Sequence, residues 1–221
     1  NLMKPHHKGC AGLAYGQAGL VYHGGMQKDT VAIDADAQQV LDFWFGSAGA
    51  GGARPEWFRK DEAFDEEIRR QFLPLWQRAA AGELNPWQLD ARSCLALLVV
   101  LDQFPRNMFR GSAQAFSTDP AARATARHAL EAGYDQLLLP VERMFIYLPL
   151  EHSESLADQH ECLRLMLSLA TFDETRDLHL WAEKHRVIIA RFGRFPHRNQ
   201  ALGRASTAEE IEFLRQPGSG F

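Results

Sequence analysis

The sequence predicts an all-α domain. From Asp34 onward, apolar residues recur at helical spacing in nearly every segment, and no segment shows alternating β-branched residues with hairpin turns. The breaks between the segments hold N-cap residues, prolines and glycines, which commonly mark helix ends. We therefore expect about eight helices, joined mostly by short loops and packed as antiparallel pairs.

Three helices are predicted in the first half of this domain. The first begins after Asp34, a candidate N-cap, and ends at Gly46. The second begins after Asp61 and contains Pro74, which should kink it. The third spans residues 91–103 and is apolar almost all round, so we expect it at the centre of the fold.

Five further helices are predicted in the second half, each with its own start signal. The signals are an N-cap residue, a proline at the first helical position or a capping box. These helices are expected to start near Asp119, Pro140, Ser153 or Ser155, Asp173, and Thr207.

The chain of 221 residues is long enough for one sizeable domain, which we place at residues 34–216. Residues 1–25 are rich in Gly and His and contain no apolar core of signal-peptide length. Met26 begins a stretch that resembles a natural start. We therefore expect residues 1–25 to be a non-native or disordered extension.

The composition argues against two classes of protein. A formal net charge of −4 gives no general attraction to nucleic acid. The longest apolar run, Cys94–Leu101, is far shorter than the roughly 20 residues of a transmembrane helix. The three cysteines are odd in number and widely spaced, which favours a reducing, cytoplasmic location.

Two similar polar phrases follow apolar helical runs. They are Phe-Pro-Arg-Asn at residues 104–107 and Phe-Pro-His-Arg-Asn at residues 195–199. In both, the proline is expected to stop the helix and leave basic and amide side chains at the break. A third cluster, Glu-His-Ser-Glu at residues 151–154, lies between them. Such crowding at helix ends suggests that a polar ligand binds there.

The candidate ligand-binding residues come from these three phrases and their neighbours. Arginine forks are the preferred clamps for carboxylates and phosphates. The candidates are Asp102, Arg106, Asn107, Arg110, Glu151, Ser153, Asp158, His197, Arg198 and Asn199. If the breaks face each other, Arg106, His152, His197 and Arg198 would converge on one anion.

Purely structural roles remain open for several of these residues. Arg106 can satisfy carbonyls at a helix end, and Asp102 can form a buried ion pair. Ser153 stands where an N-cap belongs, which we favour over a nucleophile. His185 lies on an apolar helical stripe, where a hydrogen-bonded core histidine is expected.

His152 and Glu154 are the candidate catalytic residues. Imidazole titrates near neutrality, and a neighbouring carboxylate can tune it for acid–base work. The carboxylate and histidine spacings match no strong zinc or di-iron pattern, so we expect no metal. We expect no cofactor either.

Two functional interpretations follow. The first is a helical binding module that clamps an anionic small molecule or an acidic, carboxylate-bearing peptide. The alternative is a small hydrolase or transferase that acts on an anionic substrate, with His152 as acid or base. An exposed apolar face on the first or last helix would also allow a homodimer.

Four phrases in order carry a resemblance to a known family. They are VLDFWF (40–45), LDQFPRN (101–107), LPLEHSE (148–154) and RFPHRN (194–199). Together they resemble the bacterial family catalogued as domain of unknown function 924, over roughly residues 36–216. The resemblance implies a single all-α domain of tetratricopeptide-repeat-like helical pairs and no established reaction. The extra N-terminus departs from the family pattern.

Overall fold

Helices make up the fold of the part of the chain that the structure describes. The computed structural model describes residues 33–46 and 54–220, and no strand occurs within these ranges. The all-α prediction is confirmed, whereas the tetratricopeptide-like pairing stays a prediction. The expectation for residues 1–25 concerns residues outside the described ranges.

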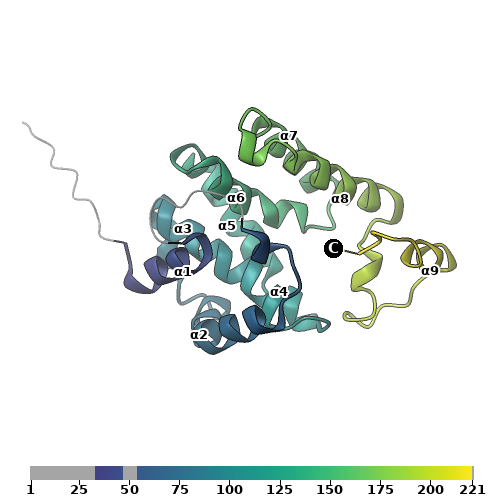
Figure 1. Ribbon diagram of the computed structural model, residues 1–221, viewed down its shortest axis with the longest axis horizontal. Helices are drawn as coiled ribbons and strands as arrows, with labels where there is room; N and C mark the ends of the chain where they lie inside the picture. The colour runs from purple at the N-terminus through teal and green to yellow at the C-terminus, as the bar shows by residue number, and fades with distance from the viewer. Residues whose placement is uncertain (1–32, 47–53, 221) are drawn as a thin grey trace, which may run out of the picture. The chain divides into compact units, whose positions relative to one another are not determined.

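Within residues 33–46 and 54–220, nine α-helices form eight rods, because α3 passes into α4 through a π-helical segment, Val99–Gln103. Neighbours in sequence pack together from α5 to α8, and Figure 1 shows α7 and α8 side by side. The helices are α1 (Ala35–Phe45), α2 (Glu62–Ala80), α3 (Ala91–Leu98), α4 (Phe104–Met108), α5 (Asp119–Glu131), α6 (Pro140–Glu151), α7 (Leu156–Ser168), α8 (Leu178–Phe192) and α9 (Ala208–Leu214).

Side-chain caps start several helices where the sequence predicts them. Asp34, Asp61 and Asp90 each accept hydrogen bonds from backbone N–H groups of the first turn. The predicted capping box at Thr207 is present, with Glu210 as its partner. These bonds satisfy amides that have no partner inside the helix.

The expectation that Pro105 stops a helix is wrong. Pro105 lies inside α4, and the helical rod continues to Met108. Its missing N–H would leave the Leu101 carbonyl unsatisfied, but the Thr118 hydroxyl donates to that oxygen at 2.6 Å. The next carbonyl, that of Asp102, accepts from Arg106 Nη1 at 2.7 Å. Both carbonyls therefore keep a hydrogen-bond donor, and the rod continues past the proline.

The second proline does not stop its helix either. α8 ends at Gly193, which adopts a left-handed φ of 69° that suits glycine. Pro196 instead opens a 3₁₀ turn, Pro196–Arg198. The two phrases therefore begin short helical turns, whereas the sequence predicted helix ends.

The core is centred on α3, as the sequence predicts. Every side chain from Cys94 to Leu101 is buried, and α3 packs against α1, α5 and α6. Beside it, the rings of Trp44 and Phe72 contact Phe104 at centroid distances of 5.7 and 4.7 Å. This packing fixes the π segment, and with it the polar residues described below.

A smaller apolar cluster joins α8 to the last part of the chain. Ile188, Ile189 and Phe195 are buried together, with Phe192 and Phe213 packed against them. We call residues 194–220 the C-terminal segment. Within the described ranges, no helix has the length and apolarity that crossing a membrane requires.

Candidate functional site

A buried carboxylate and a histidine form the centre of the candidate site. Asp102 lies in the π segment and is 1% exposed. Its two carboxylate oxygens lie 2.9 and 3.0 Å from Nδ1 of His152, and Gln103 donates to Oδ2 at 2.6 Å. Arg106 Nη1 is 3.2 Å from Oδ1. Asp102 therefore orients His152 and neutralises Arg106.

Asp102 lies in a π turn and His152 lies at the C-terminal end of a helix. A π turn inserts one extra residue into a helix and is frequent at functional sites, and Asp102 lies in such a turn. His152 follows the last residue of α6. The amide of Gln159 donates to the Glu151 and Ser153 carbonyls, at 2.6 and 2.7 Å, and so holds this helix end.

Two arginines meet at one further carboxylate, that of Asp119. Arg106 binds it with both terminal nitrogens, at 2.8 and 3.1 Å. Arg198 Nη1 lies 3.5 Å from the same carboxylate and donates to the His152 carbonyl at 3.0 Å. The structure thus brings together Arg106, His152 and Arg198, three of the four residues of the convergence hypothesis, whereas their convergence on an anion stays a prediction. We call Asp102, Arg106, Asp119, His152 and Arg198 the Arg–His cluster.

Aromatic rings surround the guanidinium of Arg198. Its carbon Cζ lies 4.7 Å from the Phe116 ring centroid and 4.4 Å from that of Phe195. Its Nε is buried and has no hydrogen-bond partner among the described residues. Burial lowers the pKa of Arg198 to about 10, and the positive charge of Arg106 adds to this effect. Arg198 is still charged at pH 7.

Burial and the charges of the cluster set the protonation states of Asp102 and His152. Burial alone would raise the pKa of Asp102, but the charges of Arg106 and His152 outweigh it and hold the pKa at about 2. Burial lowers the pKa of His152, and Arg106 lowers it further, against the opposing effect of Asp102. At neutral pH the pair is therefore a carboxylate and a neutral imidazole.

A second acid–histidine pair lies beside the first. Glu151 Oε1 is 3.3 Å from His185 Nδ1, and both side chains are buried. Burial raises the pKa of Glu151 to about 8, and the negative charge of Asp102 adds to this effect. Burial also lowers the pKa of His185 to about 3. Both groups are mostly uncharged at pH 7, as expected for a core histidine.

Ser153 is held by a hydrogen-bonded turn. Its hydroxyl donates to Asp158 Oδ2 at 2.6 Å and accepts from the Ser155 amide at 3.1 Å. Arg123 Nη1 donates to the same hydroxyl at 3.2 Å, and Arg127 pairs with Asp158. Ser155 occupies the N-cap position of α7 without a side-chain cap bond. The expectation that Ser153 is the N-cap is therefore wrong: its hydroxyl bonds to Asp158, in the first turn of α7, and orders the turn before that helix.

Glu154 holds the C-terminal segment to the rest of the chain, and Asn199 ties parts of this segment to each other. Glu154 accepts the Phe195 amide at 2.8 Å and two bonds from Arg204, at 2.8 and 2.9 Å. Asn199 donates to Glu210 at 3.3 Å and accepts from Arg204 at 2.9 Å. Glu154 thus holds the segment that carries Arg198.

His197 lies beside this fastening. Its ring centroid is 5.6 Å from that of Phe195. Burial lowers its pKa to about 4, and the positive charge of Arg198 adds to this effect. His197 is therefore uncharged at pH 7 and adds no positive charge to the cluster.

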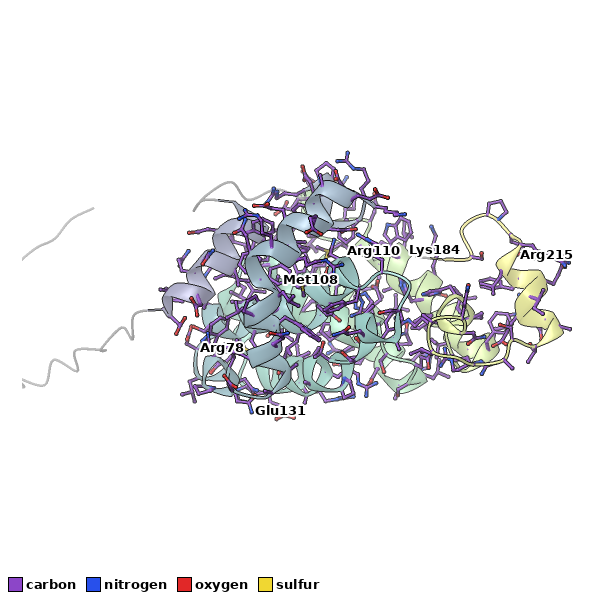
Figure 2. All side chains as sticks on the ribbon, turned by 90° about the horizontal axis from the view of Figure 1, so that it is seen from below. Arg78, Met108, Arg110, Glu131, Lys184 and Arg215 are labelled. Atoms are coloured by element: carbon purple, nitrogen blue, oxygen red, sulfur yellow. The ribbon has the colours of Figure 1, made fainter. Side chains whose placement is uncertain are left out.

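Asn107 and Arg110 bind a different carboxylate. Asn107 donates to Asp65 Oδ1 at 2.7 Å, and Arg110 donates to both Asp65 oxygens, at 2.5 and 2.9 Å. A surface hollow of about 290 Å³ lies there, and Figure 2 shows Arg110 and Met108 in this region. The sequence grouped these residues with the polar cluster, but in the structure their side chains bind Asp65.

Sequence reasoning missed three contributors to the site. The sequence marks Asp119 only as a helix-start signal, whereas in the structure Thr118 holds the N-cap position and Asp119 is the first residue of α5. Arg123 and Phe116 were not singled out. The Asp-Pro signal at 119–120 placed the helix start correctly, whereas no local pattern indicates pairing with arginines 13 or 79 residues away. Among the described residues, no group of three His, Cys, Asp or Glu side chains is arranged to hold a metal ion.

Residues 40–218 match a sequence family described as bacterial protein of unknown function (DUF924). A solved structure of a protein of unknown function from Agrobacterium tumefaciens is similar to this chain, with a TM-score of 0.72 and 42% sequence identity. The similarity covers 81% of this chain and 97% of that one. No curated protein matches the chain. Because the family match extends over most of the sequence, the chain belongs to this bacterial family of proteins of unknown function.

Proposed function

We propose that the chain binds a small anion at the Arg–His cluster. The observation that carries the proposal is the meeting of Arg106 and Arg198, from distant parts of the chain, beside His152. Arg106 and His152 keep partial exposure, with side chains 18% and 16% accessible. A small ligand can therefore reach donors that are otherwise held in place.

The charges around the cluster favour an anion. Arg106 and Arg198 are balanced by Asp102 and Asp119. Arg123 adds a third guanidinium near Ser153 and forms no ion pair among the described residues. Glu151, which is mostly protonated at pH 7, adds little negative charge. The site therefore carries an excess of about one positive charge, which a monoanion neutralises.

The π segment supports a functional role for this cluster. A regular α-helix would have sufficed to carry the apolar side chains of residues 99–101, yet the backbone widens there and presents Asp102 to His152. Such π turns are frequent at functional sites.

The anion that the cluster binds could be free in solution or be the terminal carboxylate of an acidic peptide.

Calorimetric titration with a panel of phosphate, sulfate and small carboxylates tests the proposal. The key variant is Arg123→Gln, which removes one positive charge without leaving a carboxylate unpaired. We expect it to weaken anion binding several-fold with little change in stability, whereas Arg215→Gln at the C-cap of α9 leaves binding unchanged. A ligand at 100 times its Kd should also stabilise the native protein by about 2.7 kcal/mol. If no anion in the panel binds, the proposal is wrong.

The double variant Arg106→Ala/Arg198→Ala provides a second, stricter comparison. It removes both convergent guanidiniums and should abolish anion binding. It also leaves Asp102 and Asp119 without these partners, so it should unfold at lower temperature. Binding is therefore measured well below its Tm. Undiminished binding in the folded double variant would place the anion elsewhere.

The Asp102–His152 pair favours a second candidate, a hydrolase or transferase acting on an anionic substrate. Asp102 accepts the Nδ1 proton, so Nε2 of His152 carries the lone pair and can take a proton from a water or hydroxyl. The arginines would stabilise the negative charge that develops. In an assay with aryl esters and phosphate esters, His152→Gln should lose turnover and keep anion binding. No turnover by the unaltered protein, with anion binding present, would favour the binding role.

We also infer a cytoplasmic location, from the thiols. Cys94 and Cys162 are free and buried. Burial raises the pKa of Cys94 to about 12 and that of Cys162 well above its ordinary value. Unpaired thiols are typical of proteins in a reducing compartment. Cell fractionation with an antibody against the chain tests this location.

A further inference from the structure

The two aromatic rings at Arg198 restrict the shape of anion that its guanidinium can bind. Cζ lies over both rings, 4.7 Å from the Phe116 centroid and 4.4 Å from the Phe195 centroid, so aromatic carbon borders the guanidinium. The side chain itself is only 7% exposed. What it can offer a ligand is its N–H edge.

One nitrogen of the Arg198 guanidinium, Nη1, already has acceptors within the protein. Nη1 donates to the His152 carbonyl at 3.0 Å and faces Asp119 at 3.5 Å. Nε, in contrast, is buried and donates to no described residue. A buried donor without an acceptor is unfavourable, and native proteins seldom keep one without a reason. Nε is therefore the nitrogen of Arg198 whose hydrogen bond a ligand oxygen would complete.

We propose that the ligand of the anion site is a carboxylate, bound in the plane of the Arg198 guanidinium through Nε and Nη2. This proposal rests on the proposed anion site. A carboxylate is flat, and its two oxygens match two parallel N–H bonds of one guanidinium edge. Phosphate and sulfate are tetrahedral and carry oxygens above and below that plane. Phe116 and Phe195 border the guanidinium and would present apolar carbon to oxygens outside its plane.

The charge of the site agrees with this selection. An excess of about one positive charge is neutralised by one carboxylate, whereas a phosphate dianion would leave a net negative site. Asp102 and Asp119 would then repel the second charge at short range. Shape and charge therefore select the same class of ligand.

Arg198→Lys separates charge from shape, because lysine keeps the positive charge and loses the planar fork. The probes are acetate, benzoate, inorganic phosphate and sulfate, titrated calorimetrically at pH 7. We expect the native protein to bind the carboxylates about tenfold or more tightly than phosphate. In Arg198→Lys, carboxylate binding should fall about tenfold, whereas Arg215→Lys keeps native affinities.

Several results would overturn the carboxylate assignment. Phosphate or sulfate binding as tightly as acetate would do so, as would full carboxylate affinity in Arg198→Lys. Either result leaves an anion site in place. If none of the four probes binds, the anion-site proposal itself fails, and the assignment with it.

Nuclear magnetic resonance of the native protein tests the carboxylate assignment without any substitution. In the native protein, acetate should shift the Nε–H resonance of Arg198 and slow its exchange with solvent. Phosphate at the same concentration should not do so, and the Nε–H resonance of Arg215 serves as the internal control. An Arg198 Nε–H signal that is indifferent to saturating acetate contradicts the proposal.

Discussion

Asp102 Oδ1 lies 2.9 Å from His152 Nδ1, although 50 residues separate the two in sequence. The contact joins a π turn in one helical rod to the residue after the end of α6. It also lies against Arg106, whose guanidinium contacts Asp102 and Asp119. One buried carboxylate thereby fixes a histidine and an arginine in the same place.

Replacing Asp102 with Asn should destabilise the protein by about 3 kcal/mol. The substitution leaves the guanidinium of Arg106 with Asp119 but without the negative charge of Asp102. Urea unfolding measures the change. The matched control is Asp36→Asn, which removes an exposed partner of Arg78 and should cost less than about 1 kcal/mol. Equal, small effects of the two substitutions would show that Asp102 contributes no more than a surface acid.

Glu151 should make the protein less stable as the pH rises from about 4.5 to about 8. The folded state holds its proton up to a pKa of about 8, whereas the unfolded chain releases it near the ordinary value of 4.5. Across this window the native state binds more protons, so the free energy of unfolding falls, by up to about 1.4 kcal/mol per pH unit. Glu151→Gln should remove this dependence and gain stability over the native protein toward pH 8.

Unfolding curves at pH 5, 6, 7 and 8 check this sign. His185 contributes the opposite slope between about 3 and 6.5, but it is present in both proteins and largely cancels in their difference. Glu161→Gln on α7, which removes an exposed partner of Arg164, is the control and should follow the native profile. Parallel profiles for the native protein and Glu151→Gln would mean that Glu151 is ionised in the folded state.

Glu154→Gln should loosen the C-terminal segment without unfolding the rest of the chain. Glu154 is the acceptor for the Phe195 amide and for two nitrogens of Arg204. Amide hydrogen exchange should therefore speed up at Phe195 and stay native in α3. Glu209→Gln, which removes an exposed partner of Arg191, should leave Phe195 protected. Unchanged protection in Glu154→Gln would show that the apolar cluster alone holds the segment.

The helices were largely predictable because their signals are local. Asp34, Asp61 and Thr207 cap the helices that the sequence assigned to them, and the apolar run at 94–101 is the buried centre. Pro105 was misjudged for a non-local reason. The Thr118 hydroxyl, 17 residues from Leu101, supplies the hydrogen bond that the proline cannot make.

The candidate site was predictable in part. Arg106, His152 and Arg198 stood out as polar residues in unusual places, and the fold brings them together. Their pairing with Asp119 depends on how α4, α5 and the C-terminal segment pack, which no local pattern records. The same reason explains Arg110, which resembles its neighbours in sequence but pairs with Asp65 on α2.

A titration of the native protein with acetate, followed through the imidazole resonances of His152, tests the anion site most directly. The account predicts that the His152 Nε2 signal and the Arg198 Nε–H signal shift together and give the same Kd. His179, a partly exposed histidine at the start of α8, should not move. If saturating acetate, phosphate and sulfate all leave His152 and Arg198 unshifted, the Arg–His cluster is a structural network and not a ligand site.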